Sequence, residues 1–129
     1  MATGKIPKYA NGNDTGWKEY VNENIFSGTI YYRKIGNIVN LVFEGLKLIN
    51  ESTSGNIDLG SIPASAGITP YKLTTFPVRI YTTGTTNYTC AGTVFASGNQ
   101  NAFVRIYKDP SISTVPVTAT INGNATYII

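Results

Sequence analysis

Two stretches of alternating apolar and polar residues, separated by Gly36 and Asn37, constrain the fold of this chain more than any other feature of its sequence. Alternation with a period of two is typical of a β-strand that buries one face. A two-residue Gly-Asn connection is typical of a tight hairpin turn. The pattern therefore predicts a β-hairpin whose strands are Gly28–Ile35 and Ile38–Gly45.

The expected register of this hairpin places Ile35 opposite Ile38, and it divides the side chains between two faces. The face expected to join the core carries Ile30, Tyr32, Val39, Leu41 and Phe43, with Tyr32 opposite Leu41 and Ile30 opposite Phe43. The other face carries Tyr31, Arg33, Asn40, Val42 and Glu44. This mixture of apolar and polar groups fits either an ordinary outer surface or a surface partly covered by another subunit.

Short alternating runs bounded by Gly, Pro, Asn or Ser continue along the chain, and no segment shows helical periodicity. The further strands that we expect are Gly16–Val21, Ile57–Gly60, Leu73–Tyr81, Tyr88–Phe95, Ala102–Tyr107, Val115–Ile121 and Ala125–Ile129. Asn122-Gly123 should turn the chain between the last two, and the apolar final strand should dock inside the sheet.

These elements predict an all-β fold, a single small antiparallel β-barrel or β-sandwich of about eight to nine short strands. We expect this domain to span residues 16–129 and to follow a polar N-terminal arm, residues 1–15. A chain of 129 residues is long enough to bury a core without disulfides.

The composition limits the chemistry that the chain can perform. It contains no histidine and one cysteine, Cys90, which excludes Ser-His and Cys-His pairs and a thiolate metal site. Cys90 stands among small and strand-forming residues, and we expect a buried, inert thiol. No glycine-rich phosphate loop occurs. The seven acidic residues show no spacing that brings two into one cleft, as a glycosidase requires. We therefore expect no enzymatic activity, no metal and no cofactor.

Charge and terminal features bear on the partners of the chain. The net charge is +3, but Lys and Arg are scattered, so we do not expect nucleic-acid binding. Residues 1–5 lack the apolar centre of a signal peptide, and no apolar stretch reaches membrane-spanning length. The segment 11–16 has a faint likeness to a calcium loop, but Asn22 stands where such a loop needs a bidentate Glu, and a polar turn is the better interpretation.

Aromatic residues and arginines are the remaining signal for function. The chain has nine tyrosines, and aromatic rings stack on the C–H faces of sugars while polar neighbours bind the hydroxyl groups. Trp17 at the start of the first strand fits either this role or a plug for one end of a barrel. The candidate ligand-binding residues are Trp17, Tyr31, Arg33, Tyr81, Arg105 and Tyr107.

Several short stretches resemble the C-terminal receptor-binding (head) domains of tail-fibre and baseplate proteins from phages and prophages of Gram-positive bacteria. The most recognisable is Tyr-Arg-Lys-x-Gly-Asn-x-Val over residues 32–39. The others are Gly16–Lys18, Gly60–Pro63 with Thr69-Pro70, Phe76–Val78, Thr118–Thr120 and Ala125–Ile129.

This resemblance implies a homotrimeric β-barrel or sandwich that recognises a saccharide of the host cell wall and catalyses no reaction. It places the protein in the virion, at a tail tip or baseplate, folded in the host cytoplasm and not inserted in a membrane. The alternative is a structural virion module, for decoration or baseplate assembly, that binds other virion proteins. A single-stranded nucleic-acid binder and a carboxylate hydrolase are weaker hypotheses, because the basic residues are dispersed and the acidic residues do not converge.

Overall fold

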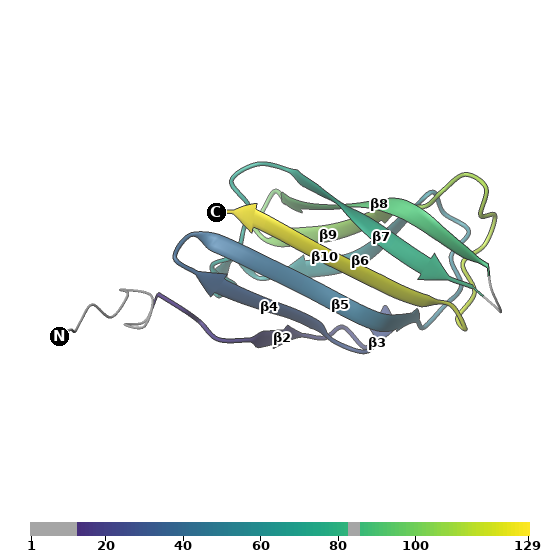
Figure 1. Cartoon of the computed structure of the whole chain (residues 1–129), viewed down its shortest axis with the longest axis horizontal. Coiled ribbons are helices and arrows are strands. Elements are labelled where there is room, and N and C mark those ends of the chain that lie inside the picture. Colours follow the sequence, from purple (N-terminus) through teal and green to yellow (C-terminus); the bar gives the residue numbers. More distant parts are fainter. Residues whose placement is uncertain (1–12, 83–85) are drawn as a thin grey trace.

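The strands of this protein join in one antiparallel sheet, as the computed structural model shows for residues 13–82 and 86–129 (Figure 1). The strands are β2 (Lys18–Tyr20), β3 (Phe26–Ser27), β4 (Ile30–Ile35), β5 (Ile38–Leu48), β6 (Asn56–Ile62), β7 (Thr74–Tyr81), β8 (Asn87–Ala96), β9 (Ala102–Tyr107) and β10 (Thr120–Ile128). A short 3-10 turn, η2 (Ala64–Ala66), follows β6. The order across the sheet is β2-β4-β5-β10-β7-β8-β9-β6, and β3 pairs with the far end of β5.

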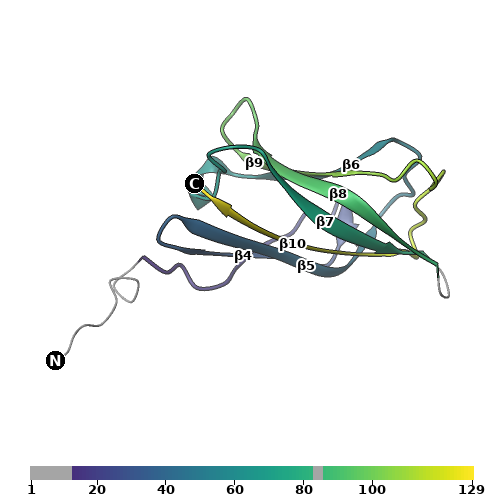
Figure 2. The ribbon, with the colours of Figure 1, turned by 45° about the horizontal axis from the view of Figure 1, so that its top comes forward.

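The sheet curls until its two edge strands, β2 and β6, approach each other, which gives a nearly closed barrel (Figures 1 and 2). Tyr20 at the end of β2 reaches across to Gly60 of β6, where a Cβ atom would lie only 2.3 Å from the phenol oxygen. Asn22 donates a hydrogen bond of 3.2 Å to that same oxygen. The predicted all-β class is confirmed, and of the two predicted architectures, barrel and sandwich, the structure has the barrel.

The β4–β5 hairpin forms with the predicted register. Ile35 pairs with Ile38, Tyr32 with Leu41 and Ile30 with Phe43. On the inner face, Ile30, Val39, Leu41 and Phe43 are buried, and Tyr32 packs against them while partly exposed. The alternation of apolar residues in this segment was therefore sufficient to establish which side chains enter the core.

Loops cover the two ends of the barrel. At the end that holds the tip of the β4–β5 hairpin, Ile68 is fully buried, and its carbonyl accepts a 2.7 Å hydrogen bond from the Tyr127 hydroxyl. At the other end, the segment between β9 and β10 buries Ile112 and Val115, and Val115 forms a bridge with Ser52. The final residue is tied to the hairpin tip, since Ile129 N–H donates to the Asn37 carbonyl at 3.0 Å.

The predicted turn at Asn122-Gly123, between strands Val115–Ile121 and Ala125–Ile129, is wrong. The chain runs straight through these residues as β10, a central strand between β5 and β7, with a bulge between Ile121 and Gly123. Gly123 is there because the ring of Phe43 lies against it: a Cβ atom would come within 2.4 Å of the Phe43 ring. Residues 115–119 belong to the loop that covers the barrel end.

Three further expectations change. The strand predicted to end at Gly45 continues to Leu48, and the short strand β3 was not predicted. Trp17 does not plug a barrel end, because 53% of it is exposed on the outside. Loop residues with branched aliphatic side chains fill the ends instead.

Most of the predicted arm, residues 1–15, lies outside the described residues, although Thr15 N–H donates to the Lys34 carbonyl of β4 at 2.9 Å.

The close contact of Gly123 with Phe43 yields a stability prediction. Gly123→Ala should lower the free energy of unfolding by about 1 to 3 kcal/mol, because the buried ring has no free volume into which it can move. Gly98→Ala is the matched control, since a Cβ atom there meets nothing within 4 Å, and its effect should stay within about 0.5 kcal/mol. Urea unfolding of both variants measures the difference, and equal stability of the two would contradict this account of β10.

Candidate functional site

A row of four side chains crosses the outside of the barrel on neighbouring strands. Glu19 of β2 pairs with Tyr31 of β4, Tyr31 pairs with Val42 of β5, and Val42 pairs with Asn124 of β10. Neighbouring strands lie about 4.8 Å apart, so the row spans roughly 14 Å, which is enough for one or two sugar rings. We call these four residues the binding row.

Trp17, just before β2, stands beside this row and completes an apolar hollow. Trp17, Tyr31 and Val42 line a shallow hollow of about 430 Å³. Both aromatic side chains are accessible, Trp17 with 53% and Tyr31 with 43% of its surface exposed. Aromatic side chains that present this much apolar surface to solvent are suited to stacking against a flat, partly apolar ligand. We refer to Trp17, Tyr31 and Val42 as the aromatic platform.

An ion pair fixes one side of the platform. The Arg33 guanidinium donates two hydrogen bonds to the Asp14 carboxylate, from Nε at 2.9 Å and from Nη2 at 2.5 Å, and its central carbon lies 5.9 Å from the centre of the Trp17 ring. The backbone N–H of Gly16 donates a further 2.9 Å hydrogen bond to Asp14. These hydrogen bonds from Arg33 and Gly16 lower the pKa of Asp14 to about 2.

The next row along the strands is polar and internally paired. Arg33 pairs with Asn40 in register, and Thr126 Oγ1 donates a 2.9 Å hydrogen bond to Asn40 Oδ1. In contrast, the side chains of Glu19 and Asn124 form no hydrogen bond or ion pair within residues 13–82 and 86–129. The binding row therefore combines an apolar centre with a carboxylate at one end and an amide at the other, both open to a ligand.

The structure brings three of the six predicted site residues together, namely Trp17, Tyr31 and Arg33. Tyr81 lies on β7 under Arg79, 5.4 Å from ring centre to guanidinium. Arg105 and Tyr107 lie on β9, with β10, β7 and β8 between them and the platform strands.

Arg105 repeats the arrangement seen at Arg33, on another part of the barrel. Its Nε donates a 2.6 Å hydrogen bond to Asp58, and its guanidinium lies 5.4 Å from the Phe95 ring centre and 5.3 Å from that of Phe103. Both rings are only half-exposed. This arrangement packs the outer surface of β8 and β9.

Asp14, Glu19 and Asn124 were not identified from the sequence as site residues. Asp14 falls in the segment expected to be an arm, and Asn124 was expected to follow a turn. The hairpin register placed Val42 beside Tyr31, but the pairing of β5 with β10 joins residues more than 80 positions apart and has no local signal.

Three further features of the described residues concern metal ligation, the single cysteine and membrane-spanning helices. No cluster of three or more Cys, His, Asp or Glu side chains suited to a metal ion occurs there. Cys90 is buried as predicted, and its burial raises the pKa of the thiol. No helix among the described residues is long and apolar enough to cross a membrane.

Comparisons of the chain with models of protein families, with curated proteins and with solved structures find no match. The function of the chain is therefore inferred from the geometry of the platform and from the resemblance of its sequence to phage receptor-binding heads.

The Asp14–Arg33 pair gives a pH prediction. The unfolded chain binds a proton at Asp14 near the ordinary pKa of 3.8, whereas the folded chain does so near 2, so the pair stabilises the fold above about pH 4 and this stability is lost as the pH falls towards 2. Urea unfolding of the wild type and of Asp14→Asn should show a difference at pH 5 that disappears by about pH 2. A difference that stays constant over this range would rule out the ion pair as its source.

Proposed function

We propose that this domain binds a saccharide of a host cell wall through the aromatic platform and catalyses no reaction. The observation that supports this proposal is the binding row, in which exposed aromatic and apolar surface lies between an open carboxylate and an open amide. A pyranose ring has this same division, with C–H groups on its faces and hydroxyl groups around its edge, so Tyr31 and Trp17 would stack on a face while Glu19 and Asn124 bind hydroxyl groups.

The resemblance to phage and prophage receptor-binding heads supports the same proposal. In this role the domain belongs to a tail tip or baseplate of a virion and recognises a polysaccharide on a Gram-positive host. Its Tyr-Arg-Lys-x-Gly-Asn-x-Val segment forms the tip of the β4–β5 hairpin, and this hairpin provides Tyr31, Arg33 and Val42.

The charges around the platform favour a saccharide without phosphate groups. Arg33 lies beside Trp17 of the platform, and Asp14 offsets its charge through two hydrogen bonds. Glu19 adds a negative charge at the end of the binding row. Arg79, two strands beyond Val42, bonds to Asn87 at 2.9 Å and lies over Tyr81. A phosphate group at the platform would therefore meet the Glu19 carboxylate and an Arg33 guanidinium whose charge Asp14 offsets.

Binding to the platform can be measured directly because Trp17 is the only tryptophan in the chain. Neutral wall polysaccharide from Gram-positive bacteria, added as purified fragments, should change Trp17 fluorescence. Trp17→Ala and Tyr31→Ala should each weaken binding roughly tenfold in calorimetry, because each removes a stacking surface.

Tyr107→Ala is the matched control, because Tyr107 is 39% exposed and lies on β9, away from both the platform and the hairpin-tip end. It should bind as the wild type does. If no fragment binds while the protein is shown to be trimeric, the saccharide proposal fails and the structural virion module becomes the better hypothesis.

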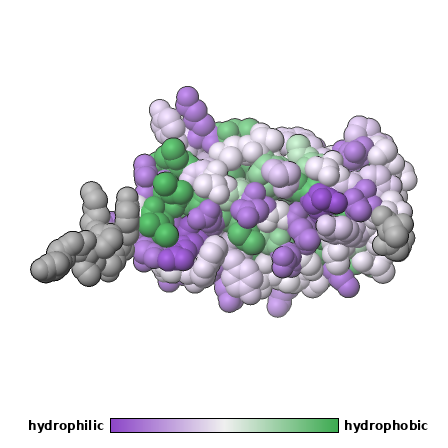
Figure 3. All heavy atoms as spheres, in the orientation of Figure 1, coloured by the Kyte–Doolittle hydropathy of each residue, from purple (hydrophilic) through white to green (hydrophobic). Residues whose placement is uncertain are grey.

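A second candidate function, contact with another protein, is favoured by an apolar patch at the end that holds the hairpin tip. Ile38 of β5 and Ile128 of β10 are register partners, 47% and 57% exposed, and Tyr71 N–H donates to the Ile128 carbonyl at 2.9 Å. Figure 3 shows hydrophobic side chains gathered on this end of the molecule. We propose that this patch contacts neighbouring copies in a homotrimer, the assembly that the resemblance implies.

The oligomeric state tests this contact. Light scattering on a size-exclusion column should give three times the chain mass of 13.9 kDa. Ile128→Lys should give the monomer, because a charge in the patch opposes its burial. Val117→Lys is the control, since Val117 is a similarly exposed apolar residue near the opposite end. A monomeric wild type would contradict the trimer.

A further inference from the structure

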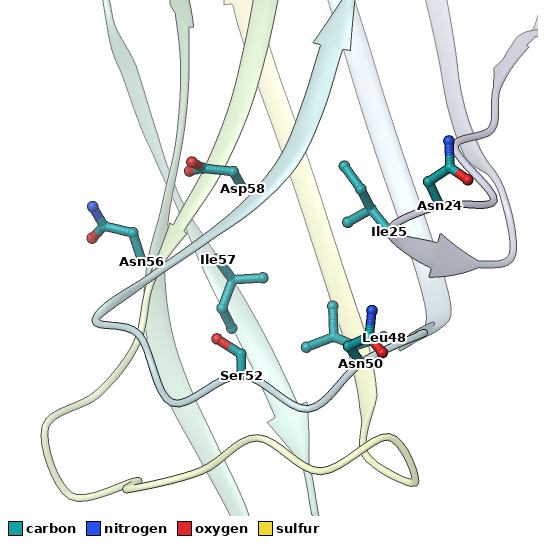
Figure 4. A pocket seen from close by; sticks show the side chains of 8 residues that line it. All are labelled: Asn24, Ile25, Leu48, Asn50, Ser52, Asn56, Ile57 and Asp58. Atoms are coloured by element: carbon teal, nitrogen blue, oxygen red, sulfur yellow. The ribbon is translucent and has the colours of Figure 1, made fainter.

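The two edges of the sheet do not meet along their whole length, and the remaining gap forms a second hollow. Tyr20 closes the gap at Gly60, but beyond this contact β6 faces the turn after β2 without a strand between them in the described part of the chain. The hollow there encloses about 240 Å³, which is the size of a single sugar residue with its substituents. We call it the seam hollow (Figure 4).

The floor of the seam hollow is aliphatic. Ile25, from the turn after β2, and Ile57 of β6 lie on opposite sides of it, and Leu48 at the end of β5 lies between them (Figure 4). Ile57 and Leu48 are almost fully buried, so the hollow reaches the outer layer of the core. A methyl group would fit such a floor and would be removed from water there.

The rim of the hollow consists of side-chain amides. Asn24 and Asn50 lie beside the floor, together with the hydroxyl of Ser52, whereas the side chain of Asn56 points away from Ile57 on the other side of β6 (Figure 4). The side chains of Asn24, Asn50 and Ser52 form no hydrogen bond within the described residues, although the backbone N–H of Asn24 and the backbone of Ser52 do. Each amide offers a donor and an acceptor, so the rim can pair with another amide group in both directions.

The charged neighbour of the hollow is already paired. Asp58 lies at its margin, but its carboxylate accepts hydrogen bonds from Nε of Arg105 at 2.6 Å and from Nη2 at 3.4 Å. A ligand at the rim would therefore meet neutral groups, and an uncharged ligand suits the seam hollow best.

We propose that the seam hollow binds a sugar residue that carries an acetamido group. The methyl of that group lies on the floor formed by Ile25, Leu48 and Ile57, and its N–H and carbonyl pair with the amides of Asn24 and Asn50. The hydroxyl groups of the ring face Ser52. This site lies past the free edge of β2, separate from the aromatic platform, and its binding does not depend on Trp17.

Nitrogen-15 NMR of the full chain tests this proposal with N-acetylglucosamine as the probe and glucose as its matched control. N-acetylglucosamine should shift the side-chain amide signals of Asn24 and Asn50 and the backbone signal of Ile57, with a dissociation constant of about 1 mM or weaker. Glucose should bind at least about fourfold more weakly, because it lacks both the methyl group that the floor removes from water and the amide that pairs with Asn24 and Asn50.

Variants separate the seam hollow from the platform. The double variant Asn24→Ala with Asn50→Ala should weaken binding of N-acetylglucosamine at least about fivefold, since both amides are lost, while the exposed positions leave the fold intact. Asn99→Ala, an exposed asparagine in the loop between β8 and β9, should bind as the wild type does. Trp17→Ala should also bind normally at the seam.

Two results would overturn the proposal. One is an equal response to glucose and N-acetylglucosamine, which would remove the role of the acetamido group. The other is a response confined to the signals of Tyr31, Val42 and Asn124, or no response at the seam, which would leave the aromatic platform as the only saccharide site. Whichever of these results is found at the seam, the measurement of platform binding through Trp17 fluorescence tests the proposed function independently.

Discussion

The barrel depends on how two phenylalanine rings pack at its centre. Each ring lies against a glycine of a neighbouring strand, where no side chain occupies the space. Phe43 and Phe76 pack edge to face with their ring centres 6.2 Å apart. Phe43 lies against Gly123 of β10, and a Cβ atom on Gly92 of β8 would come within 2.7 Å of the Phe76 ring. Because these glycines accept the rings, β5 and β7 can sit on either side of β10 with their large residues directed inward, and the sheet can curl around them.

The binding row and the aromatic platform follow from the alternation of side chains along the strands, because every second residue points to the outside of the barrel. Once Ile30, Leu41, Phe43 and Ala125 point inward, Tyr31, Val42 and Asn124 must point outward and in register. The Asp14–Arg33 pair then holds the segment before β2 against β4, which places Trp17 at the end of this row. The platform is therefore built on paired strands, and a ligand would meet side chains whose positions the core already determines.

The sequence predicted the parts of this structure that depend on neighbours in the chain. The β4–β5 register and its two faces were correct because a two-residue connection and a period of two determine them locally. The turn at Asn122-Gly123 was wrong because this dipeptide is typical of turns, whereas here Gly123 accommodates a ring from a strand 80 residues away. Trp17, Tyr31 and Arg33 came together as site residues, but Tyr81, Arg105 and Tyr107 did not, because the order of strands around the barrel separates them and no local pattern encodes that order.

The contact of Tyr20 with Gly60 has a consequence for the behaviour of many copies at high local concentration. An exposed strand edge offers unpaired backbone groups to which another chain can add, and this is a common origin of fibres and aggregates. Here the edges of β2 and β6 face each other, the phenol of Tyr20 covers the middle of β6, and a bulge between Asp58 and Gly60 distorts the remaining edge. Copies displayed side by side are thereby less prone to polymerise edge to edge, and contacts between them are left to side chains rather than to backbone pairing.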